Sequence, residues 1–281
     1  TVKKCKTNRK RSDDCPLRAF REHGRATKKP LRLPRGNGNV GAEKVTAEPV
    51  TTEQWIDNFI QYSLEQWENI ASLAVTKFPI WETLYRKVLY LILFDTLSIA
   101  ARPSLIARNQ ARFLHLTNAL TAWPDRSRVS AQQLKLSLER RKLDTGALYQ
   151  CAVATVGRWP EGSVLLGSDC DPTELSLESL ISSPDEKKVV GENRYDSLLY
   201  QYRNSLLHEF REPGYGMDIR HDAQPVYHSM IDEPWQLVFP LEFFRRLCLT
   251  AIWDVRDLLL AERRDPYDAY PFGSPWKPPK T

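Results

Sequence analysis

The segment from Pro79 to Ala101 constrains the fold of this chain more than any other part. Apolar residues recur along it at helical spacing on two adjoining faces. One face carries Ile80, Leu84, Val88, Leu91 and Ile99, and the other carries Trp81, Tyr85, Leu89 and Ile92. An apolar surface this wide predicts a helix that is buried on several sides. Its most apolar run is too short to span a bilayer and contains Asp95, so we expect a core helix and no membrane span.

Start and stop signals predict the other helices. Thr51 followed by Gln54 is a helix-start pattern, Ser130 is a helix cap, and Pro103 and Pro240 suit first helical positions. The expected helices begin near 51, run from 103 to 123, 130 to 156 and 193 to 212, and end with one from 240 to 264. Alternating residues at 224–230 and 235–238 predict a short hairpin. The predicted fold is therefore all-α, an up-and-down bundle of five to six helices with a small β-hairpin.

Composition divides the chain into regions. Residues 1–44 hold 14 of the 40 Lys and Arg residues but 4 of the 35 Asp and Glu residues, so the basic charge belongs to the N-terminal region. We expect residues 1–50 to be a disordered basic tail, because they offer little apolar surface to bury. The folded domain is expected over 51–264, with an irregular insertion at 157–192 that is rich in Gly, Pro, Ser and Asp. Residues 265–281 form a Pro-rich tail.

Targeting signals and cysteine pattern favour a cytoplasmic protein. No apolar segment follows the basic N-terminus, so no secretory signal is expected. The five cysteines are odd in number and scattered, which suits reduced thiols better than a disulfide framework.

Several cofactor motifs fail on their context. Residues 36–41 fit the dinucleotide fingerprint by letter, but no strand precedes them and prolines surround them. Cys5, Cys15 and His23 lack the paired spacing of a zinc site. A second group of acidic and His residues is interpreted as solvated loop residues rather than as metal ligands, namely Asp218, His221, Asp222, His228 and Asp232. We therefore expect neither a metal nor a cofactor.

The hexapeptide Arg203–His208, RNSLLH, is the sharpest functional feature of the sequence. Its histidine can move a proton near neutral pH, its arginine can clamp a phosphate, and Asn204 can orient either partner. In an α-helix Asn204 and His208 are nearly eclipsed, whereas Arg203 lies roughly 140° around the helix from His208. We therefore expect one chain to supply half of a site, which a second copy completes around a twofold axis.

This hexapeptide resembles the R-N-x-x-x-H signature of the HEPN superfamily, as do the Tyr-rich helix before it and Glu209-Phe210-Arg211 after it. The resemblance implies a dimeric helical bundle. It also implies a metal-independent endoribonuclease of toxin–antitoxin, CRISPR or anti-phage systems that leaves a 2′,3′-cyclic phosphate. His208 and Arg203 would then act on the scissile phosphate while Asn204 supports them. The matched motif covers six residues, and the segments 157–192 and 211–238 depart from a minimal member.

Four further residues are candidates around this motif. Asp95 interrupts an apolar helix, and it is expected either to pair with Arg203 and support the site or to form a structural pair with Arg102. Arg108 and Arg112 are four residues apart on the third helix and, with Arg211, are candidate contacts to RNA phosphates. The stripe that Arg108 and Arg112 form can equally be a solvated helix face.

Two functions of different classes follow. The first is a HEPN-like endoribonuclease that acts on RNA as a homodimer, with an antitoxin or defence-system protein as a further partner. The second is a catalytically inactive helical domain that binds RNA, a nucleotide or a protein. In the second, Arg203 and His208 are structural groups at a helix end. A purely structural assembly protein is a third hypothesis.

Overall fold

The computed structural model describes residues 50–75, 81–105, 108–119, 123–214, 218, 223–229 and 235–270. Most of the predicted basic tail lies outside these residues, as do most of the Pro-rich tail and His221, Asp222 and Asp232. The described part is all-α with one small antiparallel sheet, as predicted. None of its helices is both long enough and apolar enough to cross a membrane.

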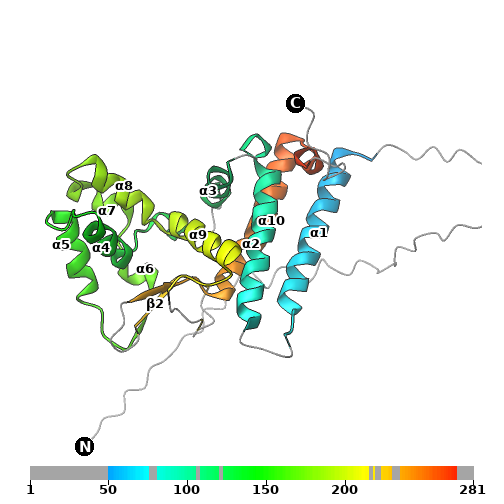
Figure 1. Ribbon diagram of the computed structural model, residues 1–281. Helices are drawn as coiled ribbons and strands as arrows, with labels where there is room; N and C mark the ends of the chain where they lie inside the picture. Colours follow the sequence, from blue (N-terminus) through cyan, green and yellow to red (C-terminus); the bar gives the residue numbers. More distant parts are fainter. Residues whose placement is uncertain are drawn as a thin grey trace, which may run out of the picture. The chain divides into compact units, whose positions relative to one another are not determined.

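Three long helices pack side by side: α1 (Thr52–Ser72), α2 (Glu82–Ala101) and α10 (Leu241–Glu262) (Figure 1). The predicted start of the first helix is confirmed. Thr51 Oγ1 accepts a hydrogen bond from the Gln54 N–H at 3.2 Å, and the Gln54 side chain accepts one from the Thr51 N–H at 2.8 Å. This reciprocal pair satisfies two backbone donors that a helix start leaves unpaired.

Helices α3 (Asn109–Ala119) and α9 (Tyr195–Asn204) complete the main core with these three. The predicted third helix, from Pro103 to Trp123, is shorter than expected. Pro103 instead begins the 3-10 turn η3 (Pro103–Leu105), and the α-helix begins six residues later. The core residues of α2 include Leu91, Phe94 and Leu97, all fully buried, so the central helix predicted from the apolar segment is present.

A second group of short helices follows Trp123. It contains η4 (Pro124–Ser127), α4 (Ala131–Arg140), α5 (Ala147–Val156), α6 (Gly167–Cys170), α7 (Glu174–Leu177), η5 (Glu178–Leu180) and α8 (Pro184–Glu192). The single helix predicted over 130–156 is wrong, because the chain turns at Lys142, whose φ is 59°. The predicted irregularity of 157–192 is also wrong. Ser183 caps α8, with Pro184 at its first position, and Val189 and Val190 are buried.

The sheet has the order β1–β2–β3, formed by Val164–Leu166, Val226–His228 and Gln236–Val238. The predicted hairpin is confirmed, since β2 and β3 pair antiparallel with Tyr227 opposite Leu237. Strand β1 was not predicted, and it places Leu165 opposite Tyr227 on the other edge of β2. This strand ties the second group of helices to the hairpin.

The start of the predicted Pro-rich tail, at residues 265–270, is folded. Residues Pro266–Ala269 form the 3-10 turn η7, with Pro266 at its first position. Tyr267 packs edge-on against Trp55 and Phe59 of α1, with ring centroids 5.5 and 5.9 Å apart. The folded region therefore extends beyond the predicted boundary at residue 264.

Candidate functional site

The hexapeptide Arg203–His208 spans a change of helix type. Helix α9 ends at Asn204 and continues as the π-helical turn η6 (Ser205–Glu209). Phe210 closes the turn with a left-handed backbone, φ 54°, and its N–H bonds to the Ser205 carbonyl five residues earlier. In such a turn, residues five apart come close together, which is not so in an α-helix. Turns of this type occur often at functional sites.

The π-helical turn brings the three motif side chains together within one chain. Arg203 Nη1 donates a hydrogen bond to Asn204 Oδ1 at 3.0 Å and lies 3.4 Å from His208 Nε2. The expectation that Arg203 and His208 cannot form a compact pair in one chain is therefore wrong. That expectation assumed α-helical geometry through His208, and the turn departs from it.

Asp95 of α2 holds the other side of the Arg203 guanidinium. Its Oδ2 accepts a hydrogen bond from Arg203 Nε at 3.0 Å and a second one from Nη2. The predicted pairing of Asp95 with Arg203 is confirmed. The alternative partner, Arg102, donates to His115 Nε2 at 2.7 Å and lies 3.4 Å from Glu262 instead. Two helices far apart in the sequence thus fix one cationic group.

Exposure differs along this constellation. Arg203 is buried, at 7% exposed, and Asn204 is half-buried, whereas His208 is exposed. Arginine has only donor N–H groups, so this contact is a hydrogen bond in the imidazole tautomer whose Nε2 carries no hydrogen. A neutral imidazole with Nε2 free of hydrogen can accept a proton. The arrangement therefore offers a solvent-accessible base beside a recessed cation.

The aromatic ring of Tyr200 lies against the Arg203 guanidinium. The Arg203 guanidinium carbon lies 5.9 Å from the centroid of that ring. Tyr200 in turn packs on Phe113 of α3, with ring centroids 5.5 Å apart. Aromatic contact of this kind favours a cation and restricts where it can move.

A buried lysine cluster, not predicted, lies on the same helix pair. The Lys87 amine of α2 is fully buried and lies 3.0 Å from Glu212 Oε2, 3.3 Å from Asp218 Oδ2 and 3.3 Å from Tyr202 Oη. Burial and the neighbouring Glu212 carboxylate raise the pKa of Tyr202 well above its usual value. This cluster anchors the chain just after the hexapeptide. A lysine within the apolar segment was the sequence signal for it.

The three predicted RNA-contact residues differ in position. Arg112 is buried, and its Nε donates to Ser98 Oγ at 2.8 Å, so the prediction that it contacts RNA phosphates is wrong. Packing of Phe113 and Leu116 in the core turns this part of α3 inward. Arg108 and Arg211 are exposed, and Arg211 pairs with Glu209 at 2.5 Å. RNA contact by these two remains a prediction.

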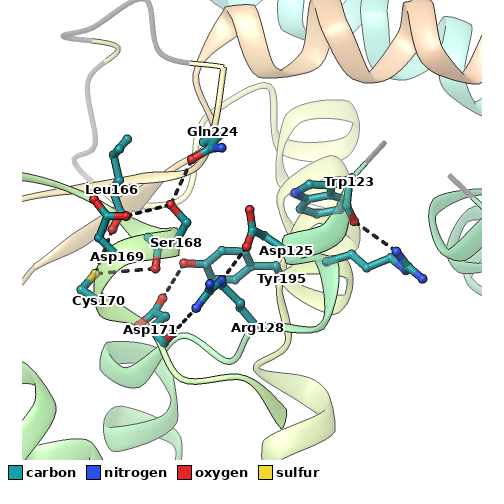
Figure 2. Close-up of polar contacts among 12 residues, drawn as sticks. Trp123, Asp125, Arg128, Leu166, Ser168, Asp169, Cys170, Asp171, Tyr195 and Gln224 are labelled. Carbon is teal, nitrogen blue, oxygen red and sulfur yellow. Dashed lines mark hydrogen bonds and ion pairs between the residues drawn. The ribbon is translucent and has the colours of Figure 1, made fainter. Parts of the chain in front are cut away.

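A second polar cluster, also missed from sequence, surrounds Asp171 (Figure 2). Asp171 Oδ2 accepts hydrogen bonds from the hydroxyls of Tyr195 at 2.6 Å and Tyr227 at 2.7 Å, and Oδ1 accepts one from the Ala131 N–H at 2.9 Å. Burial raises the pKa of this carboxyl to about 6, although the three hydrogen bonds act to lower it. All of these groups are buried, so the cluster holds elements together.

Possible metal ligands do not gather in the described part of the chain. There, no group of three or more His, Cys, Asp or Glu side chains has the arrangement of a metal site. Of the acidic and His residues considered from sequence, Asp218 binds the Lys87 amine, and His228 is buried in β2.

Comparison of the chain with protein-family models, with curated proteins and with solved structures finds no match.

Proposed function

We propose that this chain is a HEPN-like, metal-independent endoribonuclease whose site consists of Arg203, Asn204 and His208, with Asp95 as a positioning residue. One observation carries the proposal. A single chain places His208 Nε2 3.4 Å from an Arg203 guanidinium that Asp95 holds from the other side. A base next to a fixed cation is the pair of groups that RNA cleavage through the 2′-hydroxyl requires.

In the proposed reaction, His208 Nε2 takes the proton of a ribose 2′-hydroxyl. The 2′ oxygen forms a bond to the adjacent phosphorus, and the bond from phosphorus to the 5′ oxygen breaks. The 5′ oxygen leaves as a hydroxyl after taking a proton from solvent, and the imidazolium returns its proton to solvent. The products are a 2′,3′-cyclic phosphate and a 5′-hydroxyl end, so the step consumes no co-reactant.

Arg203 has the donors to bind the phosphate in this reaction. Among the described residues, its contacts with Asp95, Asn204 and His208 use four of its five N–H bonds. The remaining N–H belongs to Nη2, and the weak contact to His208 can exchange for a phosphate oxygen. The developing negative charge would then meet a cation that is already in place.

An exposed apolar surface beside the site supports the proposed homodimer. We call it the α2 stripe, and it comprises the exposed side chains of Trp81, Leu89, Ile92 and Phe210 with the half-buried ring of Tyr85. Ile92 is 47% exposed and Phe210 48%, and the rings of Phe210 and Tyr85 lie 5.5 Å apart. Contiguous exposed apolar side chains mark association surfaces. Phe210 is two residues from His208, so a second copy on the α2 stripe would place two sites near each other.

Leu89→Arg tests the homodimer by sedimentation. The variant should sediment as a monomer if the α2 stripe is the interface, because burying an unpaired charge there is unfavourable. Leu175→Arg is the matched control, since Leu175 is 75% exposed and lies outside the stripe. A wild type that is monomeric at high concentration would contradict the homodimer.

Location in the cytoplasm, and a toxin–antitoxin or phage-defence role with a partner protein, belong to the same proposal.

Cleavage of labelled RNA in EDTA tests the activity. Wild type should cut RNA, and Arg203→Ala and His208→Ala should each lose about 100-fold or more, because positioned proton transfer contributes about 10²–10⁴-fold. His115→Ala is the matched control, because His115 also contacts an arginine, Arg102, but lies outside the site. Full activity of His208→Ala would contradict the mechanism. RNA binding by wild type without cleavage would favour the inactive binding domain instead.

A further inference from the structure

The buried lysine of α2 joins the chain before the hexapeptide to the chain after it. Four buried or half-buried side chains make up what we call the Lys87 cluster, namely Lys87, Tyr202, Glu212 and Asp218. Tyr202 directly precedes Arg203, and Glu212 lies four residues after His208. The Tyr202 hydroxyl donates a hydrogen bond to Glu212 Oε2. The Lys87 amine lies 3.3 Å from that hydroxyl and 3.1 and 3.0 Å from the two Glu212 oxygens.

Lys87 and Tyr202 both depend on Glu212. Lys87 is fully buried, and the carboxylates of Glu212 and Asp218 balance its charge. Burial and the Glu212 carboxylate raise the pKa of Tyr202 well above its usual value, so the hydroxyl keeps its proton and donates it. Without Glu212, a buried hydroxyl would lose its acceptor, and Asp218 would be the remaining carboxylate beside Lys87 among the described residues. Both changes are unfavourable in the protein interior.

Tyr202 and Glu212 meet because the chain departs from an α-helix between them. They are ten residues apart in the sequence. An α-helix that continued through both would separate their Cα atoms by roughly 15 Å along its axis. Instead, the N–H groups of Phe210 and Arg211 both bond to the Ser205 carbonyl, and Phe210 is left-handed, so the chain turns back. The contacts of the Lys87 cluster therefore stabilise this turn against an α-helical continuation.

The same turn decides whether His208 reaches Arg203. In an α-helix the two side chains lie roughly 140° apart around the axis. In the structure His208 Nε2 lies 3.4 Å from Arg203 Nη1. Asp95 of α2 holds Arg203, and Lys87, eight residues earlier on α2, holds the chain after His208 through Glu212. One helix thus binds the segment that carries the site at both of its ends (Figure 1).

We propose that Lys87 and Glu212 are positioning residues, whose buried ion pair stabilises the π-helical turn and so places His208 beside Arg203. Lys87 has no exposed surface, so it acts through His208 and not on RNA. The proposal rests on the proposed ribonuclease function where it concerns cleavage. Its conformational part, the choice between a π-helical turn and an α-helix, does not depend on RNA.

NMR spectra of the full chain test the conformational part. In wild type, the ¹⁵N shifts of the His208 ring at alkaline pH should show the tautomer whose Nε2 carries no hydrogen, because Arg203 donates to that nitrogen. The HN–Hα coupling of Phe210 should match its φ of 54°. In Glu212→Ala the ring should change to the Nε2–H tautomer that a solvated imidazole prefers, and the coupling should change to a helical value. The spectrum of His208→Ala identifies the His208 signals.

RNA cleavage tests the catalytic part. Glu212→Ala should lower kcat about 10–100-fold, because displacing a reacting group by about 1 Å can cost about 100-fold. KM should change little, because Asp95 still holds Arg203, the group proposed to bind the phosphate. Glu212→Gln keeps an acceptor for the Tyr202 hydroxyl and for Lys87. It should therefore keep the wild-type tautomer and most of the cleavage.

Arg112→Met is the matched control for losing a buried polar contact. Arg112 is a buried cation of α3 that donates to Ser98 of α2, outside the segment 202–212. This variant should lower the melting temperature but leave the His208 tautomer and kcat unchanged while it is folded. If Glu212→Ala does not fold, Tyr202→Phe replaces it, because it removes the hydroxyl alone. It should lower kcat about two- to tenfold, the equivalent of one hydrogen bond.

Four results would overturn the proposal. The first two are a wild type that already has the Nε2–H tautomer, and a Glu212→Ala variant that keeps the wild-type tautomer and coupling. The others are an equal loss of kcat in Arg112→Met, and a Glu212→Ala variant whose tautomer changes while its kcat does not fall. If wild type cuts no RNA, the proposed function fails, and the NMR spectra still decide whether Glu212 stabilises the turn.

Discussion

At the first residue of α9 the Tyr195 hydroxyl binds Asp171, and at the other end of the helix Arg203 binds Asp95. Both clusters join a carboxylate to donors from distant elements. They differ in access to solvent. Asp171, Tyr195 and Tyr227 are buried with their hydrogen bonds satisfied among themselves, whereas the Arg203 cluster ends in an exposed histidine.

This difference separates a structural cluster from a candidate active site. Donors on both oxygens of Asp171 leave no approach for a substrate, and burial raises the pKa of this carboxyl. Asp95 instead fixes a cation whose far side meets His208. A search for perturbed pKa values alone would have chosen Asp171 as the functional residue. Solvent exposure therefore has to be considered together with the pKa.

The largest expected effect concerns whether the Arg203 site is complete in one chain. The test mixes two variants, Arg203→Ala and His208→Ala, under conditions that allow subunit exchange. Each variant alone should cleave RNA about 100-fold or more slowly than wild type. Because one chain holds both groups 3.4 Å apart, the mixture should show no more cleavage than its components. Recovery of cleavage in the mixture would mean that Arg203 and His208 act across two chains.

Removing Asp95 tests the charge pair by stability. Asp95→Ala should lower the free energy of unfolding by about 3–5 kcal/mol, because it leaves the buried Arg203 cation unpaired. Asp95→Asn keeps an acceptor and should lose less stability, yet it should reduce RNA cleavage. Urea denaturation measures the change in the free energy of unfolding. Asp57→Ala is the control, because Asp57 is an exposed acid 3.7 Å from Arg256. This control should change stability by less than about 1 kcal/mol. Unchanged stability and cleavage in Asp95→Asn would remove Asp95 from the site.

Asp171 should make stability depend on pH. The pKa of its carboxyl is about 6 in the folded protein and 3.8 ordinarily. The folded state therefore binds the carboxyl proton more tightly than the unfolded state does. The resulting stabilisation is full below pH 3.8 and is lost as the pH rises through about 6, at most about 3 kcal/mol in total. Asp171→Asn does not titrate. The stability of wild type minus that of the variant should therefore fall between pH 4 and pH 7 in urea titrations, and a constant difference would contradict this account.

A smaller effect is expected from Gly167→Ala beside the same cluster. A Cβ at Gly167 would lie 2.0 Å from the Tyr195 hydroxyl and 3.2 Å from the Pro225 carbonyl. The variant should lose about 1–3 kcal/mol by overpacking, as measured by thermal unfolding. Gly191→Ala is the matched control, because nothing lies within 4 Å of its Cβ and alanine favours the helix. Equal stability of the two variants would mean that the Tyr195 hydroxyl is not held in place.

Sequence alone predicted the parts of the site that depend on charge and periodicity. An acid within the apolar segment had to find a partner, which left Arg203 and Arg102 as candidates, and the structure pairs Asp95 with Arg203. The approach of His208 to Arg203 was not predictable, because nothing in SLLHE distinguishes a π-helical turn from an α-helix. Packing of the fully buried Leu206 and the left-handed Phe210 accompanies that turn.

Other parts of the fold depended on distant contacts. Arg108 lies one residue before α3, and its carbonyl accepts the Arg112 N–H at 3.0 Å, so the predicted spacing of four residues is helical. This spacing does not say which face packs on the core, and Arg112 is buried. The residues that bind the Asp171 carboxylate come from three separate segments, and two of them, Tyr195 and Tyr227, lie 24 and 56 positions away. No local pattern at 157–192 could reveal those partners.

The chemical end of the RNA product tests the central claim most directly. RNA incubated with wild type in EDTA should yield fragments whose masses show 2′,3′-cyclic phosphate and 5′-hydroxyl ends. His208→Ala should yield none of these fragments above background, while His115→Ala yields them at the wild-type rate. Fragments with 3′-hydroxyl ends, or the same cyclic ends from His208→Ala, would contradict cleavage by the Arg203–His208 site.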